Sequence, residues 1–228
     1  RYAARIIQQH TGPLRNVAII PHGISPTFRE VARTRSRSVA SDASFKVLYV
    51  SYMAMYKHQW NVVRAVAKVR ARGHDVRLRL VGGGAGRARK LTELAINEVD
   101  PERSFVRCDE FLPHTALPQV LAESDLNIFA SSCEAFGITL LEGMAAGLPI
   151  ACSERGPLPE LLEDGGVYFD PEDVESIADA VERLVVDPEL RSLLAARAYE
   201  LSKQYSWERC ARETWELLSA TVCAGRPQ

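Results

Sequence analysis

Short apolar runs alternate with longer amphipathic stretches from residue 45 onward, and this alternation is what most constrains the fold. A short apolar run bounded by turn residues predicts a buried strand, whereas apolar positions at helical spacing predict a helix. The predicted strands span residues 45–50, 76–81, 105–108, 125–130, 149–152 and 167–169. The predicted helices span residues 61–72, 88–98, 115–123, 138–146, 158–163, 173–186, 188–203 and 207–220. This order indicates a doubly wound α/β domain whose parallel sheet is covered on both faces.

Residues 1–44 lack this alternation. Residues 1–10 have the composition of a helix end, and residues 16–28 contain a short apolar run that predicts a strand followed by a turn. Residues 29–44 are rich in Arg, Ser and Ala without a period, which is typical of an exposed connection rather than of a core element. We therefore expect residues 1–44 to be the end of a missing N-terminal domain plus a linker.

Composition places the chain among globular proteins. Its 228 residues are 46% hydrophobic and 25% charged, enough for one large core. Lys and Arg total 28 against 29 Asp and Glu, so a polyanion partner such as nucleic acid is not expected. No signal peptide or apolar run of about eighteen residues is present, which predicts a cytoplasmic location. Five cysteines without a C-x-x-C pair argue against a disulfide framework and against a zinc site.

Residues 131–149, SSCEAFGITLLEGMAAGLP, place two glutamates on either side of a helix start. A small, polar turn follows the predicted strand, and the helix is expected from Ile138 until Gly147 can adopt a left-handed cap. The free N–H groups and the macrodipole of the first helical turn make this end an anion site. Glu134 precedes the helix and Glu142 lies more than one turn inside it. The two carboxylates are therefore expected to accept hydroxyl groups separately rather than to share one proton or one metal.

This arrangement suits a phosphorylated, hydroxyl-rich ligand. The alternative is that Glu134 is an ordinary loop charge and Glu142 part of a solvated helix face, since exposed carboxylates are the norm. A hydrolase that uses the two as acid and base is a further alternative, although the sequence does not predict their separation across a cleft.

The run from Glu134 to Pro149, with Glu-Ala-Phe-Gly, a second Glu eight positions after the first, and then Gly-Met-Ala-Ala-Gly-Leu-Pro, resembles a known family motif. It is similar to the Glu, seven residues, Glu motif of the retaining GT-B glycosyltransferases of the group 1 type, glycosyltransferase family 4. The resemblance covers residues 16 to about 218. It implies the C-terminal, Rossmann-like half of a GT-B fold, with a nucleotide-sugar-binding domain at 45–205 and a helix at 206–228 that crosses back towards the N-terminal domain.

The resemblance also implies a reaction. A hexose would pass with retention from a UDP, GDP or dTDP donor to a hydroxyl of an acceptor glycan or lipid-linked glycan bound by the missing domain. Glu134 would hold the sugar near its reacting carbon and Lys57 would place a positive charge on the diphosphate, so these two are the catalytic candidates. Glu142 would accept the ribose hydroxyls. No metal and no other cofactor are implied.

The resemblance assigns further residues to donor binding. Backbone N–H groups for the phosphates would come from Phe136, Gly137, Ile138 and Thr139. The remaining binding candidates are Tyr52, Gly82, Gly83, Leu112 and Leu141. A mannose or rhamnose for a surface polysaccharide, and a location at the inner face of the membrane, are what the resemblance suggests for the longer enzyme. The fragment alone is expected to bind the donor but scarcely to turn it over.

Some positions depart from the expected patterns. The family has Arg, four residues, then Lys after the first strand, and Tyr52 stands at the Arg position. The glycine-rich turn at 80–87 fails the dinucleotide fingerprint because Arg87 stands where a third Gly is required, and a plain tight turn is an alternative for it. His114, in the loop for the nucleobase, is expected to be a cap or surface residue rather than a catalyst.

Two other classes of function stay open. A noncatalytic nucleotide-binding module is supported by Tyr52 in place of Arg. A nicotinamide-dependent oxidoreductase would use the same sheet, but the failed glycine fingerprint and the absence of an acidic residue after a first-strand turn weigh against it.

Overall fold

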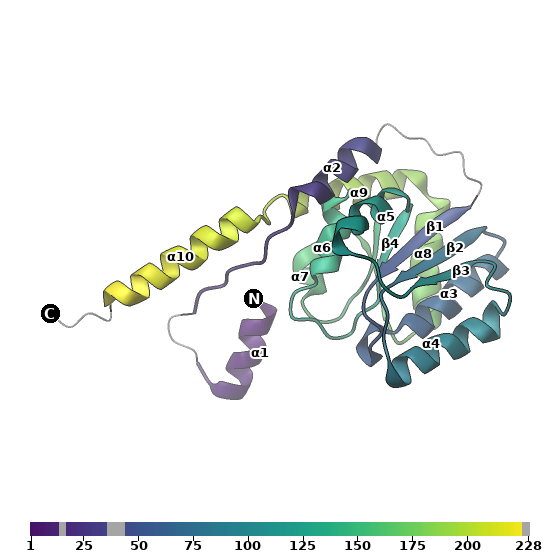
Figure 1. The fold of residues 1–228 in the computed structure, drawn as a ribbon, viewed down its shortest axis with the longest axis horizontal. Helices are drawn as coiled ribbons and strands as arrows, with labels where there is room; N and C mark the ends of the chain where they lie inside the picture. The colour runs from purple at the N-terminus through teal and green to yellow at the C-terminus, as the bar shows by residue number, and fades with distance from the viewer. Residues whose placement is uncertain (14–16, 36–43, 225–228) are drawn as a thin grey trace.

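The computed structural model describes residues 1–13, 17–35 and 44–224, and its centre is one six-stranded parallel sheet. The strands are β1 (Phe45–Val50), β2 (Val76–Val81), β3 (Val106–Asp109), β4 (Leu126–Phe129), β5 (Ile150–Ser153) and β6 (Val167–Phe169). Their spatial order is β3-β2-β1-β4-β5-β6 (Figure 1). The predicted parallel sheet is confirmed, and three of its strands have the predicted bounds.

Two helices precede β1 in the described residues, and further helices connect the strands and continue after β6. They are α1 (Tyr2–Thr11), α2 (Pro26–Arg35), α3 (Gln59–Ala71), α4 (Gly86–Val99), α5 (Leu117–Ala122), α6 (Ile138–Ala145), α7 (Leu158–Leu162), α8 (Val174–Val186), α9 (Pro188–Ser202) and α10 (Trp207–Ala224). Two short 3-10 turns, η1 (Met55–Lys57) and η2 (His114–Ala116), precede α3 and α5. The helix predicted at 115–123 is thus a 3-10 turn followed by a short α-helix.

The sheet is covered on both faces, as expected for a doubly wound domain. Helices α3, α4 and α8 pack together on one face, while α2 packs on α5 and α6, and α9 on α6 and α7, on the other (Figure 1). The central strand β4 is buried at every position. This burial explains why its sequence, Leu-Asn-Ile-Phe, is apolar at three of its four positions rather than alternating.

Helix α2 corrects the prediction of an exposed connection over residues 29–44. Phe28 and Val31 are buried, at 1% and 6% exposure, and lie three residues apart on one helical face. Ala32 lies close to Gly147, because a Cβ on that glycine would stand 2.9 Å from the Ala32 Cβ. Two buried apolar residues among many Arg and Ser are too weak a period to detect, and packing on α5 and α6 supplies the stability. Residues 36–43 of the predicted connection lie outside the described residues.

The prediction of a strand within residues 16–28 is also wrong for the residues that the structure describes. Residues 17–25 form no strand, and Val17 and Ile19 are about half exposed. The segment instead lies against the start of α10, because a Cβ on Gly23 would stand 2.1 Å from the Trp207 backbone nitrogen. Residue 16 lies outside the described residues.

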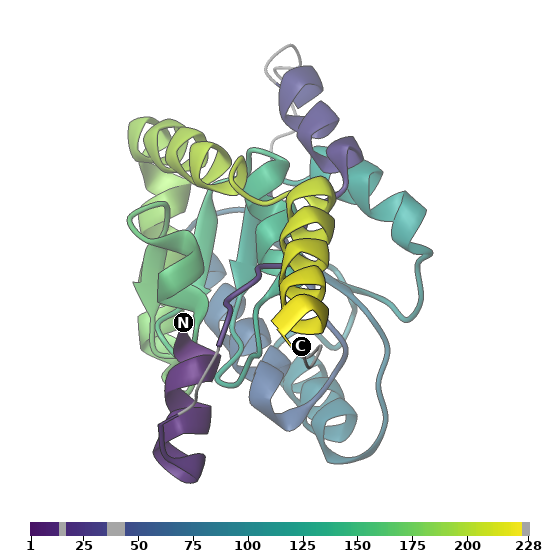
Figure 2. The same cartoon turned by 90° about the vertical axis from the view of Figure 1, so that its left-hand side faces the viewer.

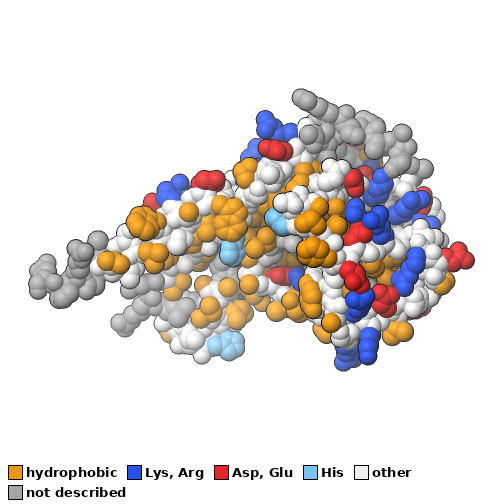
Figure 3. Space-filling view, in the orientation of Figure 1, with side chains coloured by type: hydrophobic (Ala, Val, Ile, Leu, Met, Phe, Trp, Pro, Cys, Tyr) orange, Lys and Arg blue, Asp and Glu red, His pale blue; other side chains and the backbone are white. Residues whose placement is uncertain are grey.

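Helices α1 and α10 lie on one side of the sheet domain (Figure 1 and Figure 2). Helix α10 projects away from the domain, and Figure 3 shows hydrophobic side chains along it. Trp215 and Leu218 are 72% and 56% exposed there. Within the described ranges, no helix combines the length and apolar character needed to cross a membrane.

Candidate functional site

The strand order reverses between β1 and β4, which are neighbours in the sheet but separated in the chain by β2 and β3. In open α/β sheets ligands bind beyond the carboxyl ends of the strands at such a switch point. A pocket of about 590 Å³ lies at this edge, lined by the segments that follow β1, β2 and β3 and by the first turn of α6. The pocket therefore occupies the position that the topology favours for a ligand.

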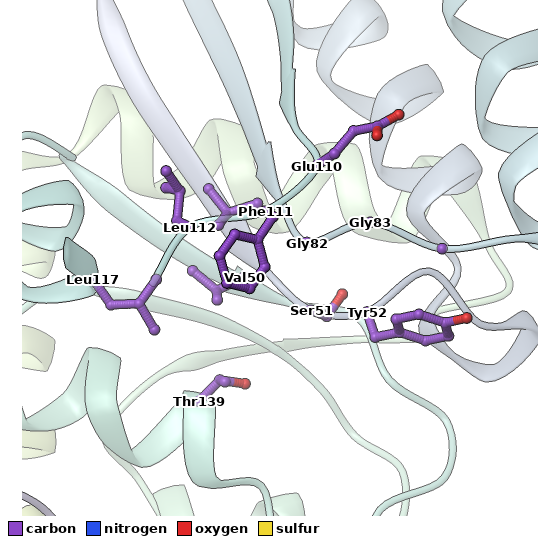
Figure 4. Close-up of a pocket in the computed structure, with 12 residues that line it drawn as sticks. Val50, Ser51, Tyr52, Gly82, Gly83, Glu110, Phe111, Leu112, Leu117 and Thr139 are labelled. Carbon is purple, nitrogen blue, oxygen red and sulfur yellow. The ribbon is translucent and has the colours of Figure 1, made fainter. Parts of the chain in front are cut away.

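Five of the predicted binding residues line this pocket. They are Tyr52, Gly82, Gly83, Leu112 and Thr139. Figure 4 shows Phe111 and Leu112 on one side of the pocket and Thr139 on the other, with the Tyr52 side chain extending away from Phe111. The Phe111 ring, 83% exposed, was not singled out from the sequence. Its signal was an aromatic residue two positions after the end of β3, in a loop where the topology places ligands.

The two predicted catalytic side chains are brought together. Lys57, at the end of η1, forms an ion pair with Glu134, in the loop after β4. The side chains are only 12% and 15% exposed, so Lys57 is not an ordinary surface lysine. The Lys57 ammonium also lies 5.0 Å from the Phe129 ring centroid and 5.4 Å from that of Tyr56. The pair joins the ends of β1 and β4 across the switch point.

Hydrogen bonds, two of them partly buried, fix the turn that carries Lys57. The Tyr49 hydroxyl donates to the Lys57 carbonyl at 2.7 Å, and burial raises the pKa of Tyr49 far above its usual value, so the hydroxyl keeps its proton. The Ser132 N–H donates to the Tyr56 carbonyl at 2.8 Å. The His58 Nε2 and Ser132 Oγ atoms are 2.9 Å apart. These bonds hold the turn after β1 to the loop after β4, and with them the Lys57–Glu134 pair.

Helix α6 begins where the sequence predicted. Gly137 precedes it with φ 100° and ψ 54°, a left-handed conformation that favours glycine. Phe136 faces away from the pocket residues, because its ring packs edge-on against His22 at 5.2 Å and Tyr205 at 5.7 Å. Ile138 is 41% exposed. Of the four residues assigned to the phosphates, only Thr139 lines the pocket, and any role of Phe136 rests on its backbone.

Glu142 is buried at 4% exposure, so it is not part of a solvated helix face. Burial raises the pKa of its carboxyl, and a hydrogen bond from His114, with Nε2 and Oε1 2.7 Å apart, opposes that rise. His114 is an exposed residue, as expected, but its bond to Glu142 was not predicted. No sequence signal pairs two residues 28 positions apart in different elements.

Leu141 does not line the pocket. Its side chain is fully buried in the hydrophobic core, so a contact between that side chain and a ligand is ruled out. Helical spacing explains the difference, because Leu141 and Glu142 are adjacent and therefore project from different parts of α6.

The glycine-rich turn after β2 is packed against the protein's own backbone. A Cβ on Gly82 would lie 2.4 Å from the Ser51 carbonyl oxygen, and one on Gly83 would lie 2.8 Å from that of Glu110. Gly82 also has φ +121°, which L side chains rarely adopt. The tight turn explains both glycines without a ligand, although both also line the pocket.

Side chains that can ligate metals, and free thiols, are scattered through the described part of the chain. No group of three His, Cys, Asp or Glu side chains there could hold a metal ion. Cys108, Cys133, Cys152 and Cys210 are free thiols. Cys152 is buried, whereas Cys133, next to Glu134, is exposed rather than packed.

Comparison with known proteins identifies the family. The sequence model of the family described as "Glycosyl transferases group 1" matches residues 31–201 of the chain. The chain belongs to this family. Among curated relatives, O-antigen chain mannosyltransferase B of Escherichia coli is 34% identical over 110 residues, which are 48% of this chain and 29% of the relative. The matches cover 29% to 54% of the length of the curated relatives, so the chain spans about half of their length or less.

Solved structures confirm the fold. Anabaena HepE in complex with UDP and glucose matches with a TM-score of 0.82 at 21% identity, covering 96% of this chain and 61% of HepE. The C-terminal domain of the group 1 protein LpcC from Francisella tularensis matches with a TM-score of 0.64 at 18% identity, covering 84% of this chain and 97% of that domain. The chain thus has the predicted Rossmann-like fold of the C-terminal half of a GT-B glycosyltransferase.

Proposed function

We propose that the chain is the donor-binding part of a retaining hexosyltransferase of glycosyltransferase family 4. The observation that carries this proposal is the Lys57–Glu134 ion pair at the switch point of the sheet, on the edge that also holds the 590 Å³ pocket. Membership of the group 1 family supports it, and so does the likeness to HepE, whose structure contains UDP and glucose.

In this proposal the donor lies along the edge of the sheet. The nucleobase and ribose occupy the pocket beside Phe111 and Leu112, with the ribose hydroxyls donating to Glu142. The diphosphate rests on the N–H groups at the start of α6 and draws on Lys57. Glu134 accepts hydroxyl groups of the hexose near its reacting carbon.

The Lys57–Glu134 pair changes its partners when the donor binds. Without ligand the two charges neutralise each other in a largely buried setting, where an unpaired charge would be costly. An arriving diphosphate offers Lys57 a second anionic partner, and the hexose hydroxyls offer donors to Glu134. As the bond between sugar and phosphate breaks, Lys57 and the helix start stabilise the negative charge on the departing diphosphate.

The domain layout is part of the proposal. Residues 45–205 form the donor-binding domain, and α2 packs onto it. Residues 1–44 belong to the end of an N-terminal acceptor domain and the linker from it. The C-terminal segment at 206–228 crosses back towards that acceptor domain. The exposed Trp215 and Leu218 on α10 and the exposed Val17 and Ile19 give that domain an apolar surface to pack against. The acceptor hydroxyl, from a glycan or a lipid-linked glycan, would be bound there.

A noncatalytic nucleotide-binding module is the second candidate, and Tyr52 is the observation that favours it. Tyr52 is 63% exposed at the pocket and carries no charge for the diphosphate. Hexose transfer by the longer protein would exclude this candidate.

Calorimetric titration of the chain tests the binding that both candidates share. The titrants are UDP, GDP and dTDP and their hexose-linked forms. We expect one nucleoside diphosphate to bind measurably, and Glu142→Ala to weaken that binding by about 10- to 100-fold, since hydrogen bonds to a charged group are lost. A folded chain that binds none of these nucleotides would contradict the proposal.

A further inference from the structure

His114 lies between two elements of the site that are distant in the sequence. Its Nε2 atom is 2.7 Å from Oε1 of Glu142 on α6. Its ring also packs edge-on against Phe28 on α2, with centroids 5.4 Å apart. The Glu142 side chain is 5% exposed and that of His114 is 66% exposed, so the bond joins a buried carboxylate to a largely exposed imidazole.

The ring of His114 has a rigid neighbour. Phe28 is 1% exposed. Helix α2, which carries it, packs against α5, which follows His114 in the chain, and against α6, which contains Glu142. An aromatic ring packed edge-on against an imidazole limits the orientations that the imidazole can adopt. The direction of the Nε2 atom is therefore set by α2 as well as by η2.

Glu142 has no other charged side chain on its own helix or on α5, as their sequences show. When the Glu142 carboxylate is ionised it only accepts hydrogen bonds, and Nε2 of His114 is then the donor. Two oxygens offer about four acceptor positions, and His114 uses one of them on Oε1. The remaining positions can accept two further hydroxyl groups.

We propose that His114 is a positioning residue for ribose recognition, which holds the buried Glu142 carboxylate in the orientation that accepts the two ribose hydroxyls. Phe28 on α2 fixes the imidazole for this task. The inference rests on the proposed function, because that proposal assigns the ribose to Glu142.

Two physical effects follow from the bond. A carboxylate already held in one orientation loses less conformational freedom when the ligand binds. Burial raises the pKa of Glu142 and the bond from His114 lowers it, so the bond also favours the ionised form that accepts from both hydroxyls. Removal of the imidazole should therefore weaken the interaction with the ribose hydroxyls more than the interaction with the rest of the nucleotide.

Titration of His114 variants with nucleotides that have or lack the hydroxyls tests the inference. The probes are UDP and GDP and their 2′,3′-dideoxy forms, and the variants are His114→Ala and His114→Gln. We expect His114→Ala to weaken binding of the preferred diphosphate about tenfold while changing the dideoxy form less than twofold. Gln keeps an N–H donor, so His114→Gln should recover most of the loss. His10→Ala, on the exposed surface of α1, is the matched control and should behave as the wild type.

The outcomes separate the two proposals. If the wild type binds a diphosphate and His114→Ala binds it equally well or more tightly, the inference is wrong and the proposed function stands. Equal losses for the ribose and dideoxy forms would also overturn it, because they would show a general effect on the pocket. A wild-type chain that binds dTDP but neither UDP nor GDP overturns the inference alone, because the sugar of dTDP has no 2′-hydroxyl. A wild-type chain that binds none of the three diphosphates contradicts the proposed function itself.

Discussion

Lys57 and Glu134 are 77 residues apart in the sequence and form a largely buried ion pair that joins the ends of β1 and β4. The sheet reverses its strand order between these two strands. When a diphosphate sugar binds, Lys57 can exchange Glu134 for the diphosphate, and Glu134 can exchange Lys57 for hydroxyl groups of the sugar. The first prediction tests that exchange.

Replacement of Lys57 by Met should weaken binding of the preferred nucleoside diphosphate about 10- to 100-fold, because a hydrogen bond between charged groups is lost at the phosphate. Calorimetry measures the change. Lys68→Met is the matched control, since Lys68 lies on α3, is 51% exposed and pairs with Glu175 away from the pocket residues. Equal affinities of Lys57→Met and the wild type would show that Lys57 does not contact the diphosphate.

The second prediction concerns why the glycine-rich turn needs glycine at Gly82, with Gly73, outside that turn, as the comparison. Both have positive φ, but a Cβ on Gly73 would meet nothing within 4 Å, whereas one on Gly82 would lie 2.4 Å from the Ser51 carbonyl oxygen. Gly73→Ala should cost about 1 kcal/mol from backbone strain alone, and Gly82→Ala at least about 2 kcal/mol more from overpacking. Urea unfolding measures both. Equal losses in the free energy of unfolding for the two variants would mean that the turn at Gly82 shifts enough to avoid the contact with the Ser51 carbonyl oxygen.

The buried Phe28 ring tests whether α2 belongs to the folded domain. Phe28→Ala should lower the free energy of unfolding by about 3–5 kcal/mol, as expected for a fully buried ring. Val17→Ala, at a half-exposed position outside any helix or strand, should change it by less than about 0.5 kcal/mol. A small effect of Phe28→Ala in urea unfolding would mean that α2 is only loosely attached.

Asp100 predicts a pH dependence of stability. Burial alone would raise the pKa of its carboxyl, but hydrogen bonds from the backbone of Phe105, Val106 and Ser104 and from the Ser104 hydroxyl hold it below the usual value. A lowered folded-state pKa means that the stabilisation is present above the unfolded-state pKa of about 3.9 and is lost as the pH falls through the folded-state value.

Asp100→Asn should therefore destabilise the chain by about 2 kcal/mol near neutral pH, since an amide N–H₂ group would face backbone N–H donors. Its difference from the wild type in urea unfolding should shrink below about pH 4. Asp179→Asn, 65% exposed, is the control with little expected change. A difference that stays constant from pH 7 to pH 3 would contradict this account of Asp100.

The sheet was predictable because its strands are marked locally. Residues 45–50 are mostly apolar, and residues 76–81 alternate Val or Leu with Arg before ending in Leu-Val. Both segments are bounded by turn residues, and β1 and β2 have the predicted bounds. The left-handed cap after α6 was equally local, since Gly147 precedes a Leu-Pro pair and has φ +68°.

Helix α2 was not predictable in the same way, because Phe28 and Val31 are its buried apolar residues and they need α5 and α6 to pack against. The same limit applies to the site. Glu134, Lys57 and Glu142 were found singly by their positions, but the ion pair and the bond from His114 depend on tertiary contacts that no local pattern encodes.

The central claim is that Glu134 recognises the hexose of a nucleotide sugar while Glu142 holds the ribose. Calorimetric affinities of the preferred diphosphate and of its hexose-linked form, measured for the wild type and for Glu134→Ala, test it most directly. The account predicts that Glu134→Ala weakens the hexose-linked form at least about tenfold and the plain diphosphate less than about threefold. Equal losses for both ligands, or no loss for either, would contradict it.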